Sequence, residues 1–512
     1  LMIRRPPRST LSSSSAASDV YKRQLNDIID TINPNIYGHF AEHLGWCIYG
    51  GVWVGEDSPI PNTGGIRNDV VAALKKMKPA VIRWPGGCFA DDYHWQDGVG
   101  PREQRPRGVN IHWGEVVESN EFGTREFVHF CRMVGAEPYI VGNVGSGTVR
   151  ELREWVEYCN FDGDSSLAQQ RAADGSPAPL DVIYWGVGNE NWGCGGSFSP
   201  EDYCTEFRRY ATFVRGFGKQ LYVIACGPSG NDIEWTVRFF RKLRHDYWNF
   251  RNIHGFAAHY YCGTAGTATG YTVDQWYELI AKGLKMEPLV VQQRAALDAY
   301  DPERKIGLIV DEWGTWHPAM PGTNPRFLYQ QNTLRDALVA ATSLDIFNRH
   351  ADKVVMTNIA QTINVLQAMI LTQEEHMLVT PTGYVYEMYA PHQGGASLRT
   401  MIESNAVTYT AGGKEQQVET VSGSASLKGP TLFLTLTNAH ATEATDVTVE
   451  LLGGARATGG KARVLTGEIH AHNTFDAPEA ITPQPFPVQA SGTSFTLTLP
   501  PASVVAAEID IE

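Results

Sequence analysis

The chain has 512 residues, of which 43% are hydrophobic, and its formal net charge is −14 at pH 7. This length can bury a large core and predicts more than one domain, although one α/β barrel can take up over half of it. The acidic balance disfavours a nucleic acid or an anionic membrane surface as a partner. No run of about 18 apolar residues occurs, so the sequence predicts no membrane-spanning helix.

Residues 1–24 differ in composition from the rest of the chain. They are rich in Arg, Ser and Pro, and their basic start leads into Ser12 to Ser15 instead of an apolar segment, which is not the pattern of a signal peptide. The stretch resembles translated adapter sequence at the ends of assembled sequencing reads. We therefore expect a non-native or disordered tail over 1–24 and a missing native N-terminus, which leaves secretion open.

From Asn35 onward, strand-like and helix-like segments alternate, which is typical of a parallel α/β fold. Eight is the number of strands that a closed (β/α)8 TIM barrel requires, and we predict such a barrel over residues 25–385. The predicted strands are 36–44, 80–85, 137–144, 182–187, 221–226, 255–261, 306–311 and 354–360, and the clearest predicted helices are 69–78, 200–217 and 325–350.

The texture of the sequence changes after about residue 386. Runs rich in β-formers at 431–437, 445–452 and 494–500 are divided by Gly, Asn and Pro. This pattern predicts an antiparallel β-sandwich over residues 386–512. No catalytic motif stands out in it, so we expect this domain to be structural.

Two predicted strands have the same design, because each ends in a glutamate with a tryptophan close by. The run 182–187 leads into Glu190 and Trp192, and the run 306–310 leads into Glu312 and Trp313. The C-terminal ends of barrel strands carry the chemistry of such folds. A lone strand-end glutamate is more often an ordinary exposed acid. Two glutamates that both end a strand beside a tryptophan favour a carboxylate pair that faces a sugar, with aromatic rings packed against the sugar face.

Polar side chains also follow most of the other predicted strands, which suits a substrate with many hydroxyl groups. The strand ends carry Glu42, Arg83, Asn143, Asn189, His259, Tyr261 and Gln361. We expect Arg83 to brace a carboxylate or backbone carbonyls and not to touch the substrate, and His259 to be either a core residue or a carboxylate partner. Trp84, Trp185 and Trp192 fit packing and a sugar platform equally, while Asp91 and Asp311 fit structural roles.

The strand-end motifs resemble those of the α-L-arabinofuranosidases of glycoside hydrolase family 51. The matching stretches are Asn35-Ile-Tyr-Gly-His-Phe-Ala-Glu-His43, Arg83-Trp-Pro-Gly-Gly-Cys-Phe-Ala-Asp91, Trp185-Gly-Val-Gly-Asn-Glu-Asn-Trp192, Asp311-Glu-Trp-Gly314 and Asn358-Ile-Ala-Gln-Thr-Ile-Asn-Val-Leu-Gln367. The resemblance implies Glu190 as general acid/base and Glu312 as nucleophile. It also implies that the sugar hydroxyls are bound by Glu42, Asn189, Tyr261 and Gln361.

The resemblance has two departures. Cys88 stands where many relatives have asparagine, so a sugar contact is expected there although a thiol is a weak hydrogen-bond donor. Relatives also begin with a strand that joins the sandwich, and here the tail takes its place.

We therefore expect an exo-acting, retaining α-L-arabinofuranosidase that releases arabinofuranosyl residues from arabinan or arabinoxylan oligosaccharides by double displacement, without a cofactor. Retention predicts carboxyl groups about 5–5.5 Å apart. A metal is disfavoured, because the histidines flanking Glu42, His39 and His43, would lie about 13 Å apart along a strand.

Three alternatives remain from the residues themselves. The nearest is another retaining glycosidase with the same two strand ends, a β-xylosidase or endo-β-glucanase, which a panel of nitrophenyl glycosides separates. A non-catalytic sugar-binding barrel would show no turnover. A metal-dependent barrel lyase would lose activity in a chelator.

Eight cysteines are scattered along the chain without a CxxC spacing, so we expect reduced thiols and a cytoplasmic protein. The family resemblance further implies a homo-oligomer, a trimer or hexamer.

Overall fold

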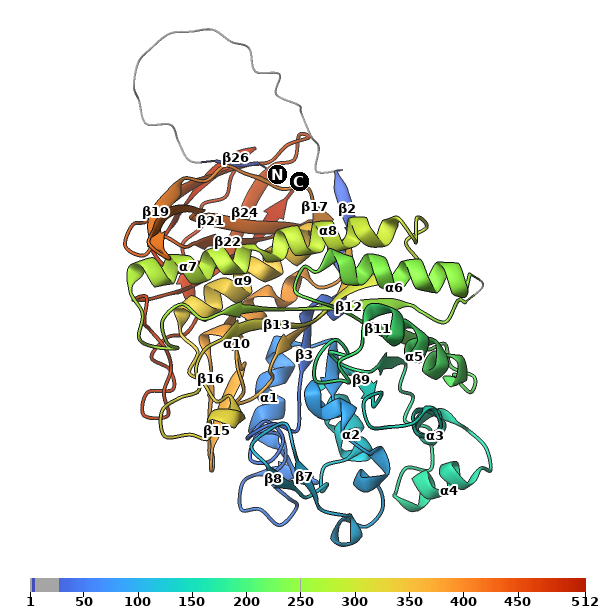
Figure 1. Cartoon of the computed structure of the whole chain (residues 1–512). Helices are drawn as coiled ribbons and strands as arrows, with labels where there is room; N and C mark the ends of the chain where they lie inside the picture. The colour runs from blue at the N-terminus through green and yellow to red at the C-terminus, as the bar shows by residue number, and fades with distance from the viewer. Residues whose placement is uncertain (1, 5–26, 249) are drawn as a thin grey trace, which may run out of the picture.

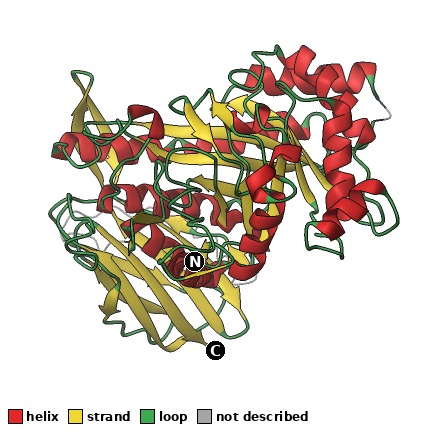
Figure 2. Cartoon of the chain, turned by 90° about the horizontal axis from the view of Figure 1, so that it is seen from below, coloured by secondary structure: helices red, strands yellow, loops and turns green. Residues whose placement is uncertain are grey.

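The computed structural model describes residues 2–4, 27–248 and 250–512 of the chain. Figure 1 shows a ring of strands with helices around it and a second region, built almost entirely of strands, packed at one end. The same division is visible from below in Figure 2, where the strands of the second region lie side by side. Among the described residues, no helix is both long enough and apolar enough to cross a membrane.

Eight parallel strands close into a barrel, which confirms the predicted fold class. Each overlaps one predicted strand, and strands that follow one another along the chain are neighbours in the ring. The strands are β3 (Gly38–Phe40), β6 (Val81–Trp84), β9 (Glu137–Gly142), β10 (Tyr184–Val187), β11 (Tyr222–Ser229), β12 (Gly255–Gly263), β13 (Gly307–Trp316) and β14 (Val354–Ala360).

The barrel interior is filled with side chains from alternate positions of these strands. Val81, Val141, Ile224, Ile309 and Met356 form one apolar cluster there. Helices cover the outside, so the strands are buried on both faces and read as continuous apolar runs in the sequence. All four residues of β6 are buried, including the charged Arg83.

Helices follow the barrel strands and lie on the outside of the ring. They are α1 (Asn68–Met77), α2 (Thr124–Val134), α3 (Val149–Asn160), α4 (Ser166–Ala173), α5 (Pro200–Phe213), α6 (Ile233–Asp246), α7 (Val273–Leu284), α8 (Met286–Asp298), α9 (Leu334–Arg349) and α10 (Pro381–Tyr389). The Ser199 side chain accepts a hydrogen bond from Asp202 N, which caps α5 as its sequence predicts. The predicted helix 325–350 begins late, because Pro325–Phe327 forms a separate 3-10 turn.

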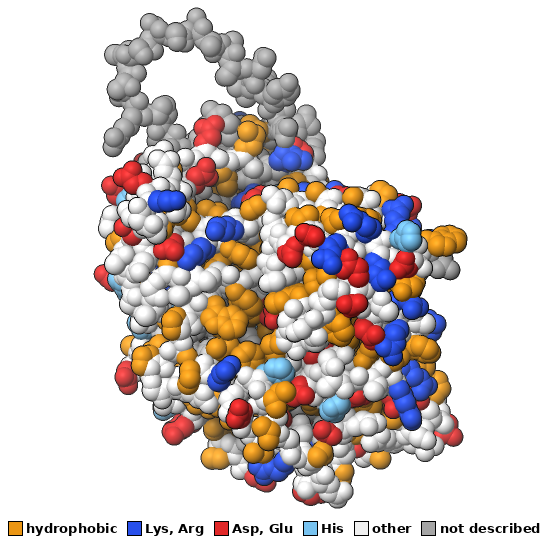
Figure 3. Space-filling view, in the orientation of Figure 1, with side chains coloured by type: hydrophobic (Ala, Val, Ile, Leu, Met, Phe, Trp, Pro, Cys, Tyr) orange, Lys and Arg blue, Asp and Glu red, His pale blue; other side chains and the backbone are white. Residues whose placement is uncertain are grey.

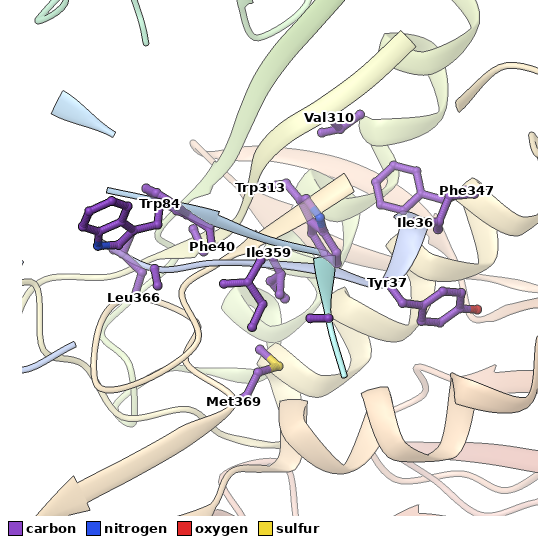
Figure 4. Close-up of a cluster of buried hydrophobic side chains, with 14 of the residues drawn as sticks. Ile36, Tyr37, Phe40, Trp84, Val310, Trp313, Phe347, Ile359, Leu366 and Met369 are labelled. Atoms are coloured by element: carbon purple, nitrogen blue, oxygen red, sulfur yellow. The ribbon is translucent and has the colours of Figure 1, made fainter. Parts of the chain in front are cut away.

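The outer faces of β13 and β14 pack against α9, and Figure 4 shows this cluster. The Trp313 ring meets Phe347 edge-on, with ring centroids 5.4 Å apart, and Trp313 Nε1 donates to Thr357 Oγ1. Successive strand residues point to opposite faces, so Trp313 enters the core while Glu312 points the other way. The expectation that Trp313 faces the sugar is therefore wrong, and Trp84 and Trp185 are fully buried as well.

The second region is a sandwich of two sheets. Strand β26 illustrates how the two sheets pack together. Its residues Phe495, Leu497 and Leu499 alternate with exposed residues and enter the apolar cluster between the sheets. One sheet has the order β18 (Met401–Ile402), β1 (Met2–Arg4), β23 (Thr445–Glu450), β26 (Ser494–Leu499). The other has the order β2 (Ile28–Thr31), β17 (Ala396–Leu398), β21 (Val421–Lys428), β22 (Thr431–Asn438), β27 (Ser503–Ile511), β24 (Ala457–Thr466), β25 (Gln484–Phe486).

Two N-terminal segments correct the predicted domain limits. Strand β1, within the predicted tail, pairs with β23 and β18, so Met2–Arg4 belongs to the sandwich. The remainder of the predicted tail, residue 1 and residues 5–24, lies outside the described residues. Strand β2, within the range assigned to the barrel, pairs antiparallel with β17. Both segments satisfy backbone groups of sandwich strands that would otherwise lack partners, and α10 runs across the predicted limit at 385.

Candidate active site

Glu190 follows strand β10, Glu312 lies within strand β13, and the two side chains converge at one mouth of the barrel. One carboxylate oxygen of each, together with a ring nitrogen of His259, lies within 4.8 Å of the other two. The side chain of Glu190 is 18% exposed, against 6% for Glu312. The two carboxyl groups therefore form a close pair in which Glu190 is the more accessible member.

Glu312 is held by hydrogen bonds on both of its oxygens. Arg83 Nη1 donates to Oε1 at 2.8 Å, and the Tyr261 hydroxyl donates to Oε2 at 2.8 Å. Burial alone would raise the pKa of Glu312, but the charges of His259 and Arg83 and these hydrogen bonds outweigh it and lower the pKa. The carboxylate is therefore kept ionised, as a nucleophile requires.

His259, on β12, lies between the two glutamates. Its Nδ1 is 3.0 Å from Glu190 Oε1 and 3.5 Å from Glu312 Oε2. Burial alone would lower the pKa of His259, but the negative charge of Glu312 and the contact with Glu190 outweigh it and raise the pKa. The sequence left two roles open for His259, a core residue or a partner of a carboxylate. These contacts show that it is a carboxylate partner.

Glu42 lies at the end of the first barrel strand and accepts three hydrogen bonds. Its Oε1 accepts from Phe89 N and from Trp113 Nε1, and its Oε2 accepts from Gln361 Nε2 at 3.0 Å. Burial, and then the charge of Glu312, raises the pKa of Glu42 to about 7. Trp113 lies in the hairpin of β7 (Gly108–Asn110) and β8 (Val116–Glu118), between the barrel strands, where strand-end reasoning did not look.

Arg83 connects three strand ends. Besides Glu312, its guanidinium donates to Asn189 Oδ1 through Nη2 and lies 3.1 Å from Asp311 Oδ2 through Nε. The predicted bracing role of Arg83 is therefore what the structure shows. Two buried side-chain atoms at this site have no hydrogen-bond partner among the described residues. They are Asn189 Nδ2 and Gln361 Oε1. Such atoms favour a ligand that supplies hydroxyl groups.

Asp91 secures the turn that delivers Asn189 and Glu190. Its Oδ2 accepts from Asn189 N at 2.7 Å, and its Oδ1 accepts from Val144 N and Gly145 N. Burial raises the pKa of Asp91 to about 7. Asp91 and Asp311 thus act on the backbone and on Arg83, as the sequence predicted, and not on the pocket.

The pocket at the barrel mouth is lined by six of the seven predicted site residues, and Asn189 is not among its lining residues. Its walls include Glu42, Cys88, Glu190, Tyr261, Glu312 and Gln361, together with Trp113 and Trp316. Trp316 was not predicted, although the two-residue period of a strand places it on the same face as Glu312. Its ring meets that of Tyr261 edge-on at 5.0 Å.

Gly86 and Gly87 leave the space that the side chains of Glu42 and Glu312 occupy. A Cβ added at Gly87 would lie 3.0 Å from Glu312 Oε1 and 3.5 Å from Glu42 Oε1, and one added at Gly86 would lie 2.5 Å from Glu42 Cγ. Larger hollows exist elsewhere, including one of about 350 Å³ lined by Ile280, Arg349 and Thr420. The pocket at the barrel mouth is the one where two carboxyl groups are paired.

The cysteines correct one prediction. Cys88 and Cys194 are joined in a disulfide, while the other six cysteines are free and buried. All eight were expected to be reduced, because residues 106 positions apart show no motif that predicts their contact. Cys88 does line the pocket, but as half of a disulfide it offers the sugar no thiol hydrogen.

Two clusters at this site have the donor types of a metal site. Cys88, Glu190 and Cys194 form one, but its sulfurs are bonded to each other and offer no thiolate. Glu190, His259 and Glu312 form the other, where the Arg83 cation already binds Glu312. His39 and His43 diverge, since His39 packs on Tyr386 and His43 faces Glu118.

A closed (β/α)8 barrel with an ionised glutamate beside a second, more accessible glutamate, in a pocket rich in hydrogen-bonding groups, defines a glycoside hydrolase. Residues 73–271 match the family described as the α-L-arabinofuranosidase 1 domain, and residues 311–503 match the α-L-arabinofuranosidase C-terminal domain.

Comparisons over the full chain agree with these matches. An intracellular exo-α-L-arabinofuranosidase of Bacteroides ovatus is 44% identical over 98% of this chain and 97% of its own. The structure of the family 51 arabinofuranosidase from Xanthomonas axonopodis pv. citri is 43% identical, with a TM-score of 0.90 over 95% and 98% of the two chains. The structure of an α-L-arabinofuranosidase from Thermotoga maritima in complex with arabinose is 30% identical, with a TM-score of 0.83 over 95% of this chain and 98% of its own.

The chain belongs to the α-L-arabinofuranosidases of glycoside hydrolase family 51.

Proposed function

We propose that this enzyme hydrolyses terminal arabinofuranosides with retention of configuration, with Glu312 as nucleophile and Glu190 as general acid/base. The observation that carries the proposal is the close pair, in which carboxylate oxygens of the two residues lie within 4.8 Å. Retaining enzymes place their carboxyl groups about 5–5.5 Å apart, whereas inverting enzymes leave about 6.5–9.5 Å for a water molecule.

In the first step, Glu312 Oε attacks the anomeric carbon while the bond from that carbon to the leaving oxygen breaks. Glu190 donates its proton to the leaving oxygen. In the second step, Glu190 removes a proton from water as the water attacks the same carbon, and Glu312 leaves as a carboxylate. The hydrogen bonds from Arg83 and Tyr261 stabilise that carboxylate as it departs.

We assign binding of the sugar hydroxyls to Glu42, Asn189, Tyr261 and Gln361. Glu42, Tyr261 and Gln361 line the pocket. Asn189 Nδ2 and Gln361 Oε1 are buried without a hydrogen-bond partner among the described residues. Cys88 would contact the sugar through its disulfide sulfur. The substrate class we propose is arabinofuranosyl-bearing arabinan or arabinoxylan oligosaccharides. We propose that they are attacked from their ends, and the B. ovatus relative is named as exo-acting. A panel of nitrophenyl arabinofuranosides, xylosides and glucosides measures this preference.

The roles of the two glutamates are tested by substitution and chemical rescue. Glu190→Ala should still form the glycosyl-enzyme from dinitrophenyl arabinofuranoside, whose leaving group needs no proton, and azide should restore its turnover with retained configuration. Glu312→Ala should lose turnover on every substrate, and azide should give it only an inverted product. Retained azide product from Glu312→Ala, and none from Glu190→Ala, would show that the roles are exchanged.

We also propose an intracellular, cytoplasmic homo-oligomer, a trimer or hexamer. The B. ovatus relative is named as intracellular. Val109, Ile111 and Val117 are 55–62% exposed on the β7–β8 hairpin, and such an apolar group favours contact with another chain. Light scattering should show the oligomer, and cell fractionation of the source organism should recover the activity with the cytoplasm. A monomer, or secreted activity, would contradict the respective part.

Acidic and basic side chains are interspersed over the face that Figure 3 shows, and the described residues of this face form no continuous basic surface. A polyanion would be recognised by a continuous basic surface instead.

A further inference from the structure

The Cys88–Cys194 disulfide joins two loops at the mouth of the barrel. Cys88 begins the 3-10 turn Cys88–Asp91 after β6, and Cys194 lies in the turn after β10. In the ring of strands, β9 lies between β6 and β10. The bond therefore spans one strand and connects the loop beneath the sugar pocket to the loop that carries Glu190.

Cys194 is coupled to Glu190 through a short stretch of backbone. The carbonyl oxygen of Glu190 accepts from Gly193 N at 2.7 Å and from Gly195 N at 3.2 Å, on either side of Cys194. Glu190 itself has a φ of +41°, a left-handed conformation that a residue with a side chain keeps only when its surroundings hold it. The disulfide is one of the constraints that hold this turn.

Cys194 also touches the carboxyl group directly. Its Sγ lies 3.6 Å from Glu190 Oε2. Within the disulfide this sulfur carries no hydrogen, so the contact is not a hydrogen bond. As a free thiol, the same sulfur would donate to the carboxylate, and a donated hydrogen bond favours the charged form. A charged Glu190 has no proton to give to a leaving group.

The bonded pair is also the accessible pair. Cys88 and Cys194 are both partly exposed, while the six free cysteines are buried. A reductant in solution therefore reaches these two sulfurs first. Disulfides are rare in reducing compartments, and those that occur there usually respond to redox conditions.

We propose that the Cys88–Cys194 disulfide positions Glu190, and that its reduction by a dithiol selectively slows the proton-transfer steps of hydrolysis. The proposal rests on the acid/base role proposed for Glu190. In the reaction the dithiol supplies two electrons and two protons, the Sγ–Sγ bond breaks, both cysteines become thiols, and the reductant becomes a disulfide. Loss of the constraint removes the hold on the position of Glu190, and gain of the thiol donor leaves Glu190 less often protonated, so both slow proton donation to the leaving group.

The test compares two substrates on the oxidised and the dithiothreitol-reduced enzyme. Methyl arabinofuranoside needs a proton on its leaving oxygen, and dinitrophenyl arabinofuranoside does not. Reduction should lower kcat/KM for the methyl glycoside by about tenfold or more, a part of the usual contribution of a general acid, and leave glycosylation by the dinitrophenyl glycoside unchanged. Reoxidation should restore the loss, and alkylation with mass measurement should locate the two new thiols at Cys88 and Cys194.

Variants provide the matched comparison. Cys194→Ala cannot form the bond and offers no thiol donor, so it should show the selective loss without dithiothreitol and no further response to it. Cys131→Ala, in helix α2, should respond to dithiothreitol as the wild type does. If Cys194→Ala fails to fold, the reduced wild type still decides the question.

Several outcomes would overturn the proposal. They are free Cys88 and Cys194 thiols in the air-oxidised protein, no kinetic effect of verified reduction, and equal slowing of both substrates, which would mark a merely structural bond. Glu190→Ala separates this proposal from the one on which it rests. If Glu190→Ala discriminates between the two substrates and the reduced enzyme does not, only the role of the disulfide fails.

Discussion

Arg83 Nη1 lies 2.8 Å from Glu312 Oε1, and both side chains are buried. The same guanidinium reaches Asp311 and Asn189, so one cation fixes the position of Glu312 and of Asn189, which directly precedes Glu190. A planar group with five donors can do this, whereas an ammonium group binds as a single point charge.

Arg83→Lys should therefore weaken the hold on Glu312. The lysine keeps a positive charge but loses contacts to at least one partner. We therefore expect a lower kcat/KM, equivalent to a loss of about 1.5–3 kcal/mol of transition-state stabilisation. Since the contacts of Arg83 lower the pKa of Glu312, their loss should raise that pKa and move the acid limb of the pH profile of kcat/KM to higher pH.

Arg171→Lys is the control for this prediction, because Arg171 is equally buried but binds the carbonyl oxygens of Tyr158 and Phe161. It should lower the melting temperature and leave the acid limb in place. An acid limb that does not move in Arg83→Lys would argue that Arg83 only supports the fold.

Gln361→Ala tests binding of the sugar hydroxyls. Gln361 donates to Glu42 Oε2, and its buried Oε1, which has no hydrogen-bond partner in the described part of the chain, can accept from a hydroxyl group. We expect the fold to be unchanged and kcat/KM to fall by an amount equivalent to about 1–3 kcal/mol of transition-state stabilisation. Glu42→Gln should behave similarly. Melting temperature and activity measured on the same preparations decide the matter, because parallel losses would indicate a structural role for both residues.

Asp345 predicts a pH dependence of stability at the contact between α9 and the sandwich. Its Oδ1 accepts from the hydroxyls of Ser424 and Thr435, and burial raises its pKa to about 7. An aspartate with a raised folded-state pKa contributes stability below its unfolded pKa of about 3.8, and that contribution is lost as pH rises through about 7.

Asp345→Asn cannot ionise, so the melting temperature of the variant relative to the wild type should increase between pH 5 and pH 8. The difference increases because only the wild type loses this stabilisation as the pH rises. A difference that is constant over this range, or that decreases, would contradict the raised pKa. Activity should not follow this difference, since Asp345 lies at the sandwich contact and not in the pocket.

The sequence by itself determined the eight barrel strands, the sandwich and the convergence of polar strand ends. These features depend on local patterns: apolar runs set the strands, Ser199 and Pro200 set the start of α5, and a parallel barrel brings all strand ends of one polarity to the same mouth. Placing Glu190 and Glu312 side by side needed only their positions at strand ends.

Tertiary structure alone decided which side chains face the pocket and which distant segments meet. Trp313 and Trp316 differ by three positions on one strand, yet the first packs on Phe347 and the second lines the pocket. A strand that is apolar on both faces does not reveal in its sequence which face turns inward. The Cys88–Cys194 bond and the pairing of Met2–Arg4 with β23 join residues far apart in sequence, and such contacts arise only when the barrel closes and the sandwich assembles.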